Sequence, residues 1–281
     1  MALPDFLIIG AMKCGTSTLQ AQLTLQEGVF MTTPKEPNFF SDDDVYSRGI
    51  DWYEGLFADA GQGELKGEAS THYTKLPTYP HTLDRMLPVL PDVRLIYVIR
   101  DPLDRAISHY IHEWSEARMG DDAIAAFREH PELVQYGCYG MQIAPFVEAY
   151  GVDGLFLTSL EQLKSDPDRE FSRIADFLGL SAGASWRNDV GPQNVSAERM
   201  RRLPMQGLLL DNSVAQFLRR SLVPKQVRTW IRESRTMRKR PSLPETLQDQ
   251  LRAEFLRDRE VLAGMFPAHP VLEICYPFAS K

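Results

Sequence analysis

The stretch FLIIGAMKCGTSTL, residues 6–19, decides the fold class of this chain. Phe6 to Ile9 form a short, continuous apolar run, which is typical of a strand buried on both faces of a parallel sheet. A glycine-containing turn follows, and Leu19 and Leu23 then recur at helical spacing. The order strand, loop, helix predicts a phosphate-binding loop, because the backbone N–H groups and the dipole at a helix N-terminus favour a bound anion.

The loop carries side chains that suit a bound phosphate or sulfate. Gly15 permits close approach of a ligand, and Lys13, Thr16, Ser17 and Thr18 add hydrogen-bond donors. The lysine precedes the second glycine, whereas a Walker A loop has Gly-Lys-Ser/Thr in that order. The pattern therefore argues against a kinase loop. A P-loop nucleotide kinase or NTPase stays an alternative, as does a non-catalytic nucleotide-binding protein.

A second buried strand is predicted over residues 93–99 (VRLIYVI), directly before Arg100. A proline two residues later suits the first turn of a helix, which is expected over residues 103–118. The guanidinium of Arg100 at the end of the strand and the hydroxyl of Ser108, two turns into the helix, can converge on one phosphate. Arg105 is expected to make a structural ion pair.

The remaining pattern predicts one α/β domain over residues 1–281. A helix, a strand, a helix and a final amphipathic helix are expected over residues 141–150, 154–158, 167–178 and 244–265. Strands separated by helices imply a parallel sheet that is covered by helices on both faces. Residues 183–243, which prolines interrupt repeatedly, are predicted to form a lid or C-terminal cover region.

Composition excludes several function classes. The net charge of -7 argues against general nucleic-acid binding, because proteins that hold a phosphate backbone usually carry a basic surplus. Cys14, Cys138 and Cys275 lack metal-ligand spacing and are expected to be free thiols. The N-terminal apolar run is too short for a signal peptide, and no stretch reaches membrane length. We therefore expect a cytoplasmic protein without a membrane span or a nucleic-acid partner, and its oligomeric state is left open.

Both phosphate-binding segments resemble those of sulfotransferases that use 3′-phosphoadenosine 5′-phosphosulfate (PAPS). Residues 10–19 resemble the 5′-phosphosulfate loop of that family, G-x-x-K-x-G-T-[ST]-x-L, and residues 100–108 resemble its 3′-phosphate segment, R-[DN]-P-x-x-R-x-x-S. The resemblance implies a P-loop NTPase-like sulfotransferase fold, PAPS as donor, 3′-phosphoadenosine 5′-phosphate (PAP) as product, and no metal. It assigns the cofactor to Lys13, Cys14, Gly15, Thr16, Ser17, Thr18, Arg100 and Ser108.

The motif order between these segments is similar to the glycosaminoglycan (heparan sulfate) branch of the family. In that branch K/E-E-x-x-F-F supplies a glutamate general base, which corresponds to Glu36 in this sequence. His72 is a second candidate base, and Lys13 is expected to stabilise charge on the leaving group. Substrate contacts are expected from Lys35, Phe39 and Glu68.

One departure from that branch concerns the acceptor. A lysine follows the glutamate of E-K-[ST] there, but this chain has Ala69, which argues against a polyanionic glycan. A hydroxyl or amine of a carbohydrate, a lipid or a secondary metabolite fits the remaining pattern, so the acceptor is a small molecule or a glycan. Residues 193–196 (QNVS) are expected near the 3′-phosphate. Residues 219–240 hold nine basic residues and one acidic residue, which suit either an anionic ligand or a solvated surface.

Overall fold

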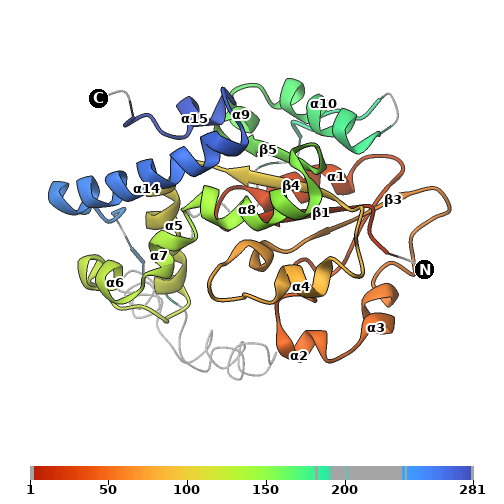
Figure 1. Cartoon of the computed structure of the whole chain (residues 1–281), viewed down its shortest axis with the longest axis horizontal. Coiled ribbons are helices and arrows are strands. Elements are labelled where there is room, and N and C mark those ends of the chain that lie inside the picture. Colours follow the sequence, from red (N-terminus) through yellow and green to blue (C-terminus); the bar gives the residue numbers. More distant parts are fainter. Residues whose placement is uncertain are drawn as a thin grey trace, which may run out of the picture.

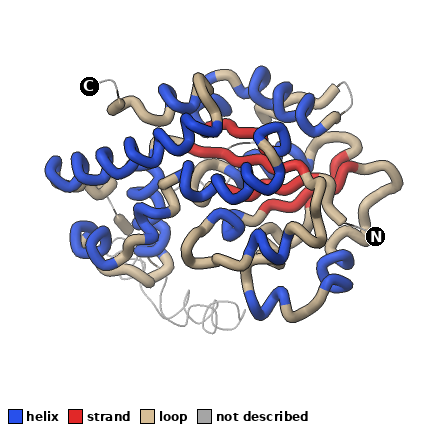
Figure 2. The backbone as a smooth tube through the Cα atoms, viewed as in Figure 1, coloured by secondary structure: helices blue, strands red, loops and turns tan. Residues whose placement is uncertain are grey.

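A five-stranded sheet in the order β2-β3-β1-β4-β5, with every pair parallel, forms the centre of the molecule in a computed structural model (Figures 1 and 2). Its strands are β1 (Phe6–Gly10), β2 (Val29–Met31), β3 (Leu65–Ala69), β4 (Arg94–Ile99) and β5 (Leu155–Ser159). All of β1 and the last five residues of β4 are buried, as expected of inner strands of a covered parallel sheet. The predicted α/β class with a central parallel sheet is confirmed.

The structure describes residues 3–180, 183–189, 191, 201, 236–237 and 239–279. The predicted cover region 183–243 therefore lies mostly outside the described residues. The same holds for all of 193–196 and for most of the basic segment 219–240.

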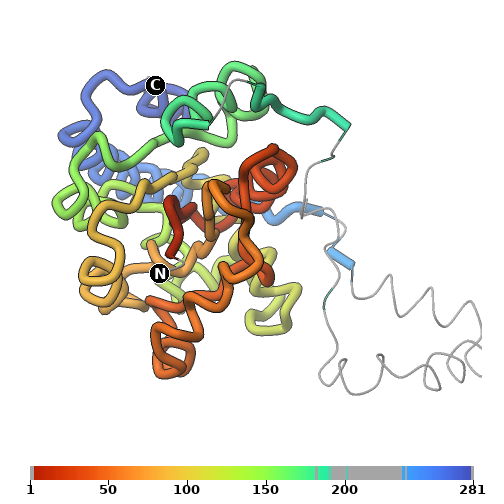
Figure 3. Tube along the Cα trace, turned by 90° about the vertical axis from the view of Figure 1, so that its right-hand side faces the viewer, coloured from red at the N-terminus to blue at the C-terminus, as the bar shows by residue number. Residues whose placement is uncertain are grey.

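Helices connect the strands and cover both faces of the sheet. They are α1 (Thr16–Thr24), α2 (Asp43–Tyr46), α3 (Ile50–Gly55), η1 (Thr71–Thr74), α4 (Thr82–Met86), α5 (Pro102–Ser115), α6 (Ala123–Glu129), α7 (Glu132–Gln135), α8 (Tyr139–Tyr150), η2 (Val152–Gly154), α9 (Leu160–Ser165), α10 (Pro167–Leu178), α14 (Glu245–Met265) and α15 (Val271–Ile274). Figures 1 and 3 place α8 and α14 on one face of the sheet and α1 on the other. The helices predicted from the sequence are all present, with boundaries that agree within a few residues.

Helix α14 closes the α8 face through one buried carboxylate. Asp258 accepts hydrogen bonds from the backbone N–H groups of Gly140 and Met141, each at 2.8 Å, in the first turn of α8. A side chain at Gly140 would collide with the backbone of α14, because a Cβ there would lie 2.6 Å from the carbonyl oxygen of Asp258. Close approach of the two helices thus depends on this glycine.

The strand order brings four loops to one edge of the sheet. Because all strands are parallel, their carboxyl ends lie at the same edge, where ligands bind in open α/β folds. The loop after β2 carries Glu36, the segment after β3 carries His72, the loop after β1 carries Lys13, and Arg100 follows β4. Side chains far apart in the sequence are therefore expected to meet along this edge.

Candidate active site

The loop between β1 and α1 has a backbone that requires glycine. Gly15 is the residue before α1 and has φ +90°, a conformation that a side chain rarely adopts. A Cβ at Gly15 would also lie 2.8 Å from Cδ1 of Leu160. Because the residue before α1 has no side chain, a ligand can closely approach the N–H groups of the first turn of this helix, as the predicted anion loop requires.

Arg100 joins this loop to the end of β4. Its Nη1 donates to the carbonyl oxygen of Lys13 at 3.4 Å, and its Nη2 pairs with Asp104 at 2.9 Å. The hydroxyl of Tyr139 donates to the carbonyl oxygen of Arg100 at 3.0 Å and lies 3.6 Å from Sγ of Cys14. The two phosphate-binding segments predicted from the sequence are therefore in direct contact.

Arg100 and Lys13 are both well covered. The guanidinium nitrogen Nε of Arg100 is buried without a hydrogen-bond partner in the described part of the chain, so one strong donor remains for a ligand. Burial lowers the pKa of Lys13, and the neighbouring charge of Arg100 lowers it further. Ser108 lies buried on α5, two turns beyond Arg100.

Arg105 does not make the predicted ion pair with any described residue. Its side chain is fully buried, and Nη2 donates to the carbonyl oxygen of Leu133 in the neighbouring helix α7. Burial lowers its pKa. The expectation failed because the partner is a backbone carbonyl, a group that every residue type carries and that the sequence therefore does not reveal.

Glu36 lies on the loop after β2 in a polar environment. Its carboxylate oxygen Oε1 accepts from Nζ of Lys35 at 2.8 Å and from Oγ1 of Thr71 at 3.1 Å. Its backbone N–H donates to the carbonyl oxygen of Ala69, which fixes the loop to the end of β3. Burial opposes ionisation of Glu36, but the charge and hydrogen bond of Lys35 outweigh it and lower the pKa of this carboxyl. The side chain is 30% exposed, so an ionised oxygen remains within reach of a ligand.

His72 is a neutral, stacked imidazole. Its ring lies 4.7 Å from the ring of Tyr79 at an angle of 17°. Burial, followed by the charge of Lys75, lowers the pKa of His72 to about 4, although Glu36 acts in the opposite direction. Nδ1 is buried and has no hydrogen-bond partner in the described structure. The histidine is thus uncharged near neutral pH and a weak proton acceptor.

The structure places Glu68 and Phe39 in the core, although substrate contacts were expected from both. Glu68 is fully buried in β3 and accepts from the hydroxyls of Tyr53 and Ser70, each at 2.5 Å, and of Tyr73 at 3.1 Å. Burial raises its pKa. Phe39 stacks on Tyr53 with ring centroids 4.5 Å apart. Both side chains are therefore buried in the core of this structure, and neither exposes a surface to a ligand.

Two charged side chains near this edge were not singled out from the sequence. Lys75 follows η1 and is buried, with Nζ 5.8 Å from the ring centroid of Tyr136. Glu113 on α5 pairs with Arg118 at 2.9 Å and lies 3.6 Å from Nε2 of His109. Their only signal in the sequence was their charge. Sheet topology brings them beside the predicted site.

Residues with a strained backbone conformation cluster in the candidate site. Lys13, Glu36 and Asn38 have φ values of 68°, 56° and 56°, in the left-handed region that non-glycine residues rarely adopt. They make up three of the five such residues in the described part of the chain. Strain of this kind costs about 1–3 kcal/mol per residue and is characteristic of functional sites.

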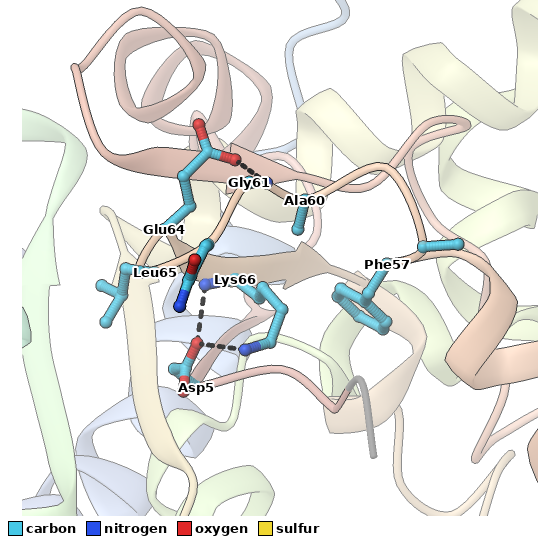
Figure 4. A pocket seen from close by; sticks show the side chains of 10 residues that line it. Asp5, Phe57, Ala60, Gly61, Glu64, Leu65 and Lys66 are labelled. Atoms are coloured by element: carbon cyan, nitrogen blue, oxygen red, sulfur yellow. Dashed lines mark hydrogen bonds and ion pairs between the residues drawn. The ribbon is translucent and has the colours of Figure 1, made fainter.

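A shallow pocket of about 660 Å³ opens at the opposite edge of the sheet (Figure 4). It lies before the starts of β1 and β3 and is lined by Asp5, Phe57 and residues 60–66. The charged side chains of the pocket interact with other residues that line it. Asp5 pairs with Lys66 at 3.3 Å, and Glu64 accepts a hydrogen bond from the N–H of Gly61. It contains none of the predicted site residues.

Residues 3–253 match the family described as the sulfotransferase domain, and the chain belongs to that family. Mouse heparan sulfate glucosamine 3-O-sulfotransferase 6 is 32% identical over 185 residues, which cover 63% of this chain and 52% of the relative. Mouse heparan sulfate glucosamine 3-O-sulfotransferase 3A1 is 31% identical over 187 residues, 63% of this chain and 46% of the relative. The chain thus spans about half the length of the curated relatives it matches.

Solved structures share the fold. A sulfotransferase from Alicyclobacillus acidocaldarius superposes with a TM-score of 0.66 at 24% identity, covering 94% of this chain and 96% of that one. Mouse sulfotransferase SULT7A1, solved in complex with PAP, gives a TM-score of 0.51 at 16% identity and covers 98% and 89% of the two chains. The predicted sulfotransferase-type fold is confirmed.

Among the described residues, no helix is long and apolar enough to cross a membrane.

Proposed function

We propose that this chain transfers a sulfuryl group from PAPS to a hydroxyl or amine of an acceptor. One observation carries the proposal within the sulfotransferase family: the guanidinium of Arg100 touches the backbone of Lys13, so the loop after β1 and the end of β4 form one continuous surface. A nucleotide with phosphates at both its 5′ and 3′ positions suits a surface with two adjacent anion sites. The PAP-bound relative of the same fold supports this choice of donor.

The loop after β1 is assigned to the 5′ end of the donor. The N–H groups at the start of α1 and the side chains of Lys13, Thr16, Ser17 and Thr18 would hold the phosphosulfate, with Cys14 and Gly15 contributing backbone. Arg100, with its unpartnered buried Nε, and Ser108 would bind the 3′-phosphate. Binding energy at the 3′-phosphate would then fix the sulfur against the acceptor.

Transfer is an in-line displacement at sulfur. The acceptor oxygen or nitrogen forms a bond to sulfur, and the bond between sulfur and the bridging oxygen of the 5′-phosphate breaks. The electron pair of the broken bond stays on the phosphate of PAP, and the proton of the acceptor passes to a carboxylate. Lys13 and the loop N–H groups would stabilise the charge that develops on the bridging oxygen and the phosphate, in the manner of phosphoryl transfer.

Glu36 is the proposed proton acceptor. Its lowered pKa keeps it ionised at neutral pH, and Thr71 and Lys35 orient its carboxylate. His72 fits the role less well because its ring stacks on Tyr79 and its Nδ1 is buried, whereas the Glu36 side chain is 30% exposed and can reach an acceptor. Lys35 is proposed to hold Glu36 and to reach the acceptor beside it.

The acceptor class is proposed more broadly than that of the curated relatives. Their names specify glucosamine units of heparan sulfate. A glycan acceptor is therefore the first choice, and a small hydroxyl compound is the second. Ala69 supplies no charge at the position where the heparan branch carries a lysine, so we propose a less acidic glycan than heparan sulfate.

Glu36→Gln tests the proposed chemistry directly. Wild type and variant are incubated with PAPS labelled in its sulfuryl group and a panel of glucosamine oligosaccharides and phenols, and labelled product is counted. We expect the variant to lose about 10²–10⁴-fold in rate, the usual contribution of a general base, while PAP affinity changes less than twofold. Glu64→Gln, which changes a glutamate of the distant pocket, should keep wild-type rates.

Two results would overturn parts of this proposal. An unchanged rate in Glu36→Gln would remove Glu36 as the base. Magnesium-dependent ATP turnover without any sulfuryl transfer would favour the P-loop kinase alternative.

A further inference from the structure

Lys75 is a buried ammonium without a direct anionic partner. The residue is 7% exposed, and no carboxylate of the described residues lies within ion-pair distance of its Nζ. The ring of Tyr136 lies beside it, with its centroid 5.8 Å from Nζ. A buried charge that is not directly paired lowers the stability of the fold, so its retention calls for a role outside stability.

The surroundings of Lys75 connect it to the proposed base. Lys75 directly follows the segment η1, whose first residue, Thr71, donates to the carboxylate of Glu36. On its other side the ring of Tyr136 stacks on His109 with centroids 5.5 Å apart, and His109 lies beside Glu113. Lys75 therefore sits between the Glu36 loop and the Glu113 face of α5.

The electrostatic couplings agree with this placement. Burial lowers the pKa of Lys75 to about 8, and the charges of Glu36 and Glu113 act against that decrease. The same two carboxylates also act against the decrease in the pKa of Lys13, the proposed leaving-group lysine. The charges of Glu36 and Glu113 thus act on both lysines. The remaining charged or titratable groups around Lys75 are Arg105, Arg118, His72 and His109.

We propose that Lys75 is a further binding residue of the reaction centre, which holds an anionic oxygen beside Glu36 during sulfuryl transfer. This inference rests on the proposed function. The oxygen belongs either to the sulfuryl group in flight or to an acidic substituent of the acceptor, which present the same chemistry to an ammonium. Lys75 keeps its proton throughout, so the proton of the acceptor still passes to Glu36.

The test compares Lys75→Met, which keeps the length of the side chain without its charge, with Lys75→Arg, which keeps the charge. Lys164→Met, at an exposed position of α9, is the matched control. Rates are measured at saturating PAPS on a neutral glucosamine oligosaccharide, an N-sulfated glucosamine oligosaccharide and p-nitrophenol. PAP affinity is measured by calorimetry, and the melting temperature is recorded for each variant.

We expect Lys75→Met to lose at least tenfold in kcat/KM, Lys75→Arg to recover a substantial part of it, and Lys164→Met to match wild type. PAP affinity should stay within twofold, and the melting temperature of Lys75→Met should rise, because a buried charge is replaced by an apolar chain. A loss in kcat on every acceptor assigns the oxygen to the sulfuryl group. An increase in KM confined to the N-sulfated acceptor assigns the oxygen to the acceptor.

The pH profile supplies a second readout. Since the pKa of Lys75 is about 8, wild-type kcat/KM should fall above that pH as the ammonium is lost, and Lys75→Arg should extend activity to higher pH. Lys75→Met rates within twofold of wild type on every acceptor would overturn the inference while leaving the proposed function intact. A wild-type protein that transfers sulfuryl to none of the acceptors would overturn the proposed function, and the role of Lys75 with it.

Discussion

At the scale of single residues, the site contains residues other than glycine in a backbone conformation that is energetically unfavourable for them. Lys13, Glu36 and Asn38 hold left-handed φ values without being glycine, and Gly15 holds one directly before α1. The lysine and glycine of the loop were identified from the sequence because they lie between the first predicted strand and the first predicted helix. The strain at Glu36 and Asn38 was not, because φ depends on the hydrogen bonds of Glu36 to Ala69 and of Asn38 to Ser70 across the site.

Gly15→Ala tests whether the loop geometry serves the nucleotide. The new Cβ would meet a left-handed φ of +90° and the side chain of Leu160, so PAP affinity should fall at least tenfold. Stability should fall by about 1 kcal/mol, as expected for alanine at a positive φ. Gly28→Ala is the matched control, since Gly28 has φ +77° but open space around it and lies away from the loop. Equal loss of PAP affinity in both variants would contradict a role of Gly15 in nucleotide binding.

At the scale of elements, the long and strongly apolar segments were predictable, and the short polar ones were not. β1, β4, α5 and α10 were identified because apolar runs, a proline start and a glycine end mark them. β3, with sequence LKGEA, was missed because Lys66 and Glu68 hide its pattern. Glu68 is tolerated inside the sheet only because three hydroxyls from other segments donate to it, and this arrangement follows from tertiary packing.

Helix α5 should make the protein sensitive to acid through His109. Burial lowers the pKa of His109 to about 4, opposed by Glu113 and assisted by the charges of Arg105 and Lys75. The unfolded chain binds a proton at this histidine near pH 6.5, so the stabilising contribution is complete above that pH and is lost as pH falls toward 4. The free energy of unfolding should therefore decrease over this window, by up to about 3 kcal/mol from this residue.

His109→Gln, which keeps a donor toward Glu113, should make that decrease shallower in urea unfolding at pH 6.5, 5.5 and 4.5. His81→Gln is the control, because His81 is exposed. A slope that is unchanged in His109→Gln would show that this histidine does not carry the acid sensitivity.

At the scale of the whole molecule, strand order determines which side chains meet. The order β2-β3-β1-β4 lines up Glu36, Lys75, Lys13 and Arg100 at the carboxyl edge, each after a different strand. The proposed acceptor side therefore lies toward β2, and the proposed 3′-phosphate side lies toward β4. Sequence motifs predicted Glu36, Lys13 and Arg100. No motif marks Lys75 or Glu113, and only the fold shows that they lie near these residues.

The central claim is that one nucleotide spans the loop after β1 and Arg100, and calorimetry with PAP and 5′-AMP tests it most directly. These ligands differ in the 3′-phosphate alone. Wild type should prefer PAP by about 10–100-fold, as a charge-assisted hydrogen-bonded contact predicts, and Arg100→Ala should reduce this preference to nearly one with little change in 5′-AMP affinity. Arg169→Ala, at an exposed position of α10, should retain the preference. Equal binding of PAP and 5′-AMP to wild type, or an unchanged preference in Arg100→Ala, would contradict the account.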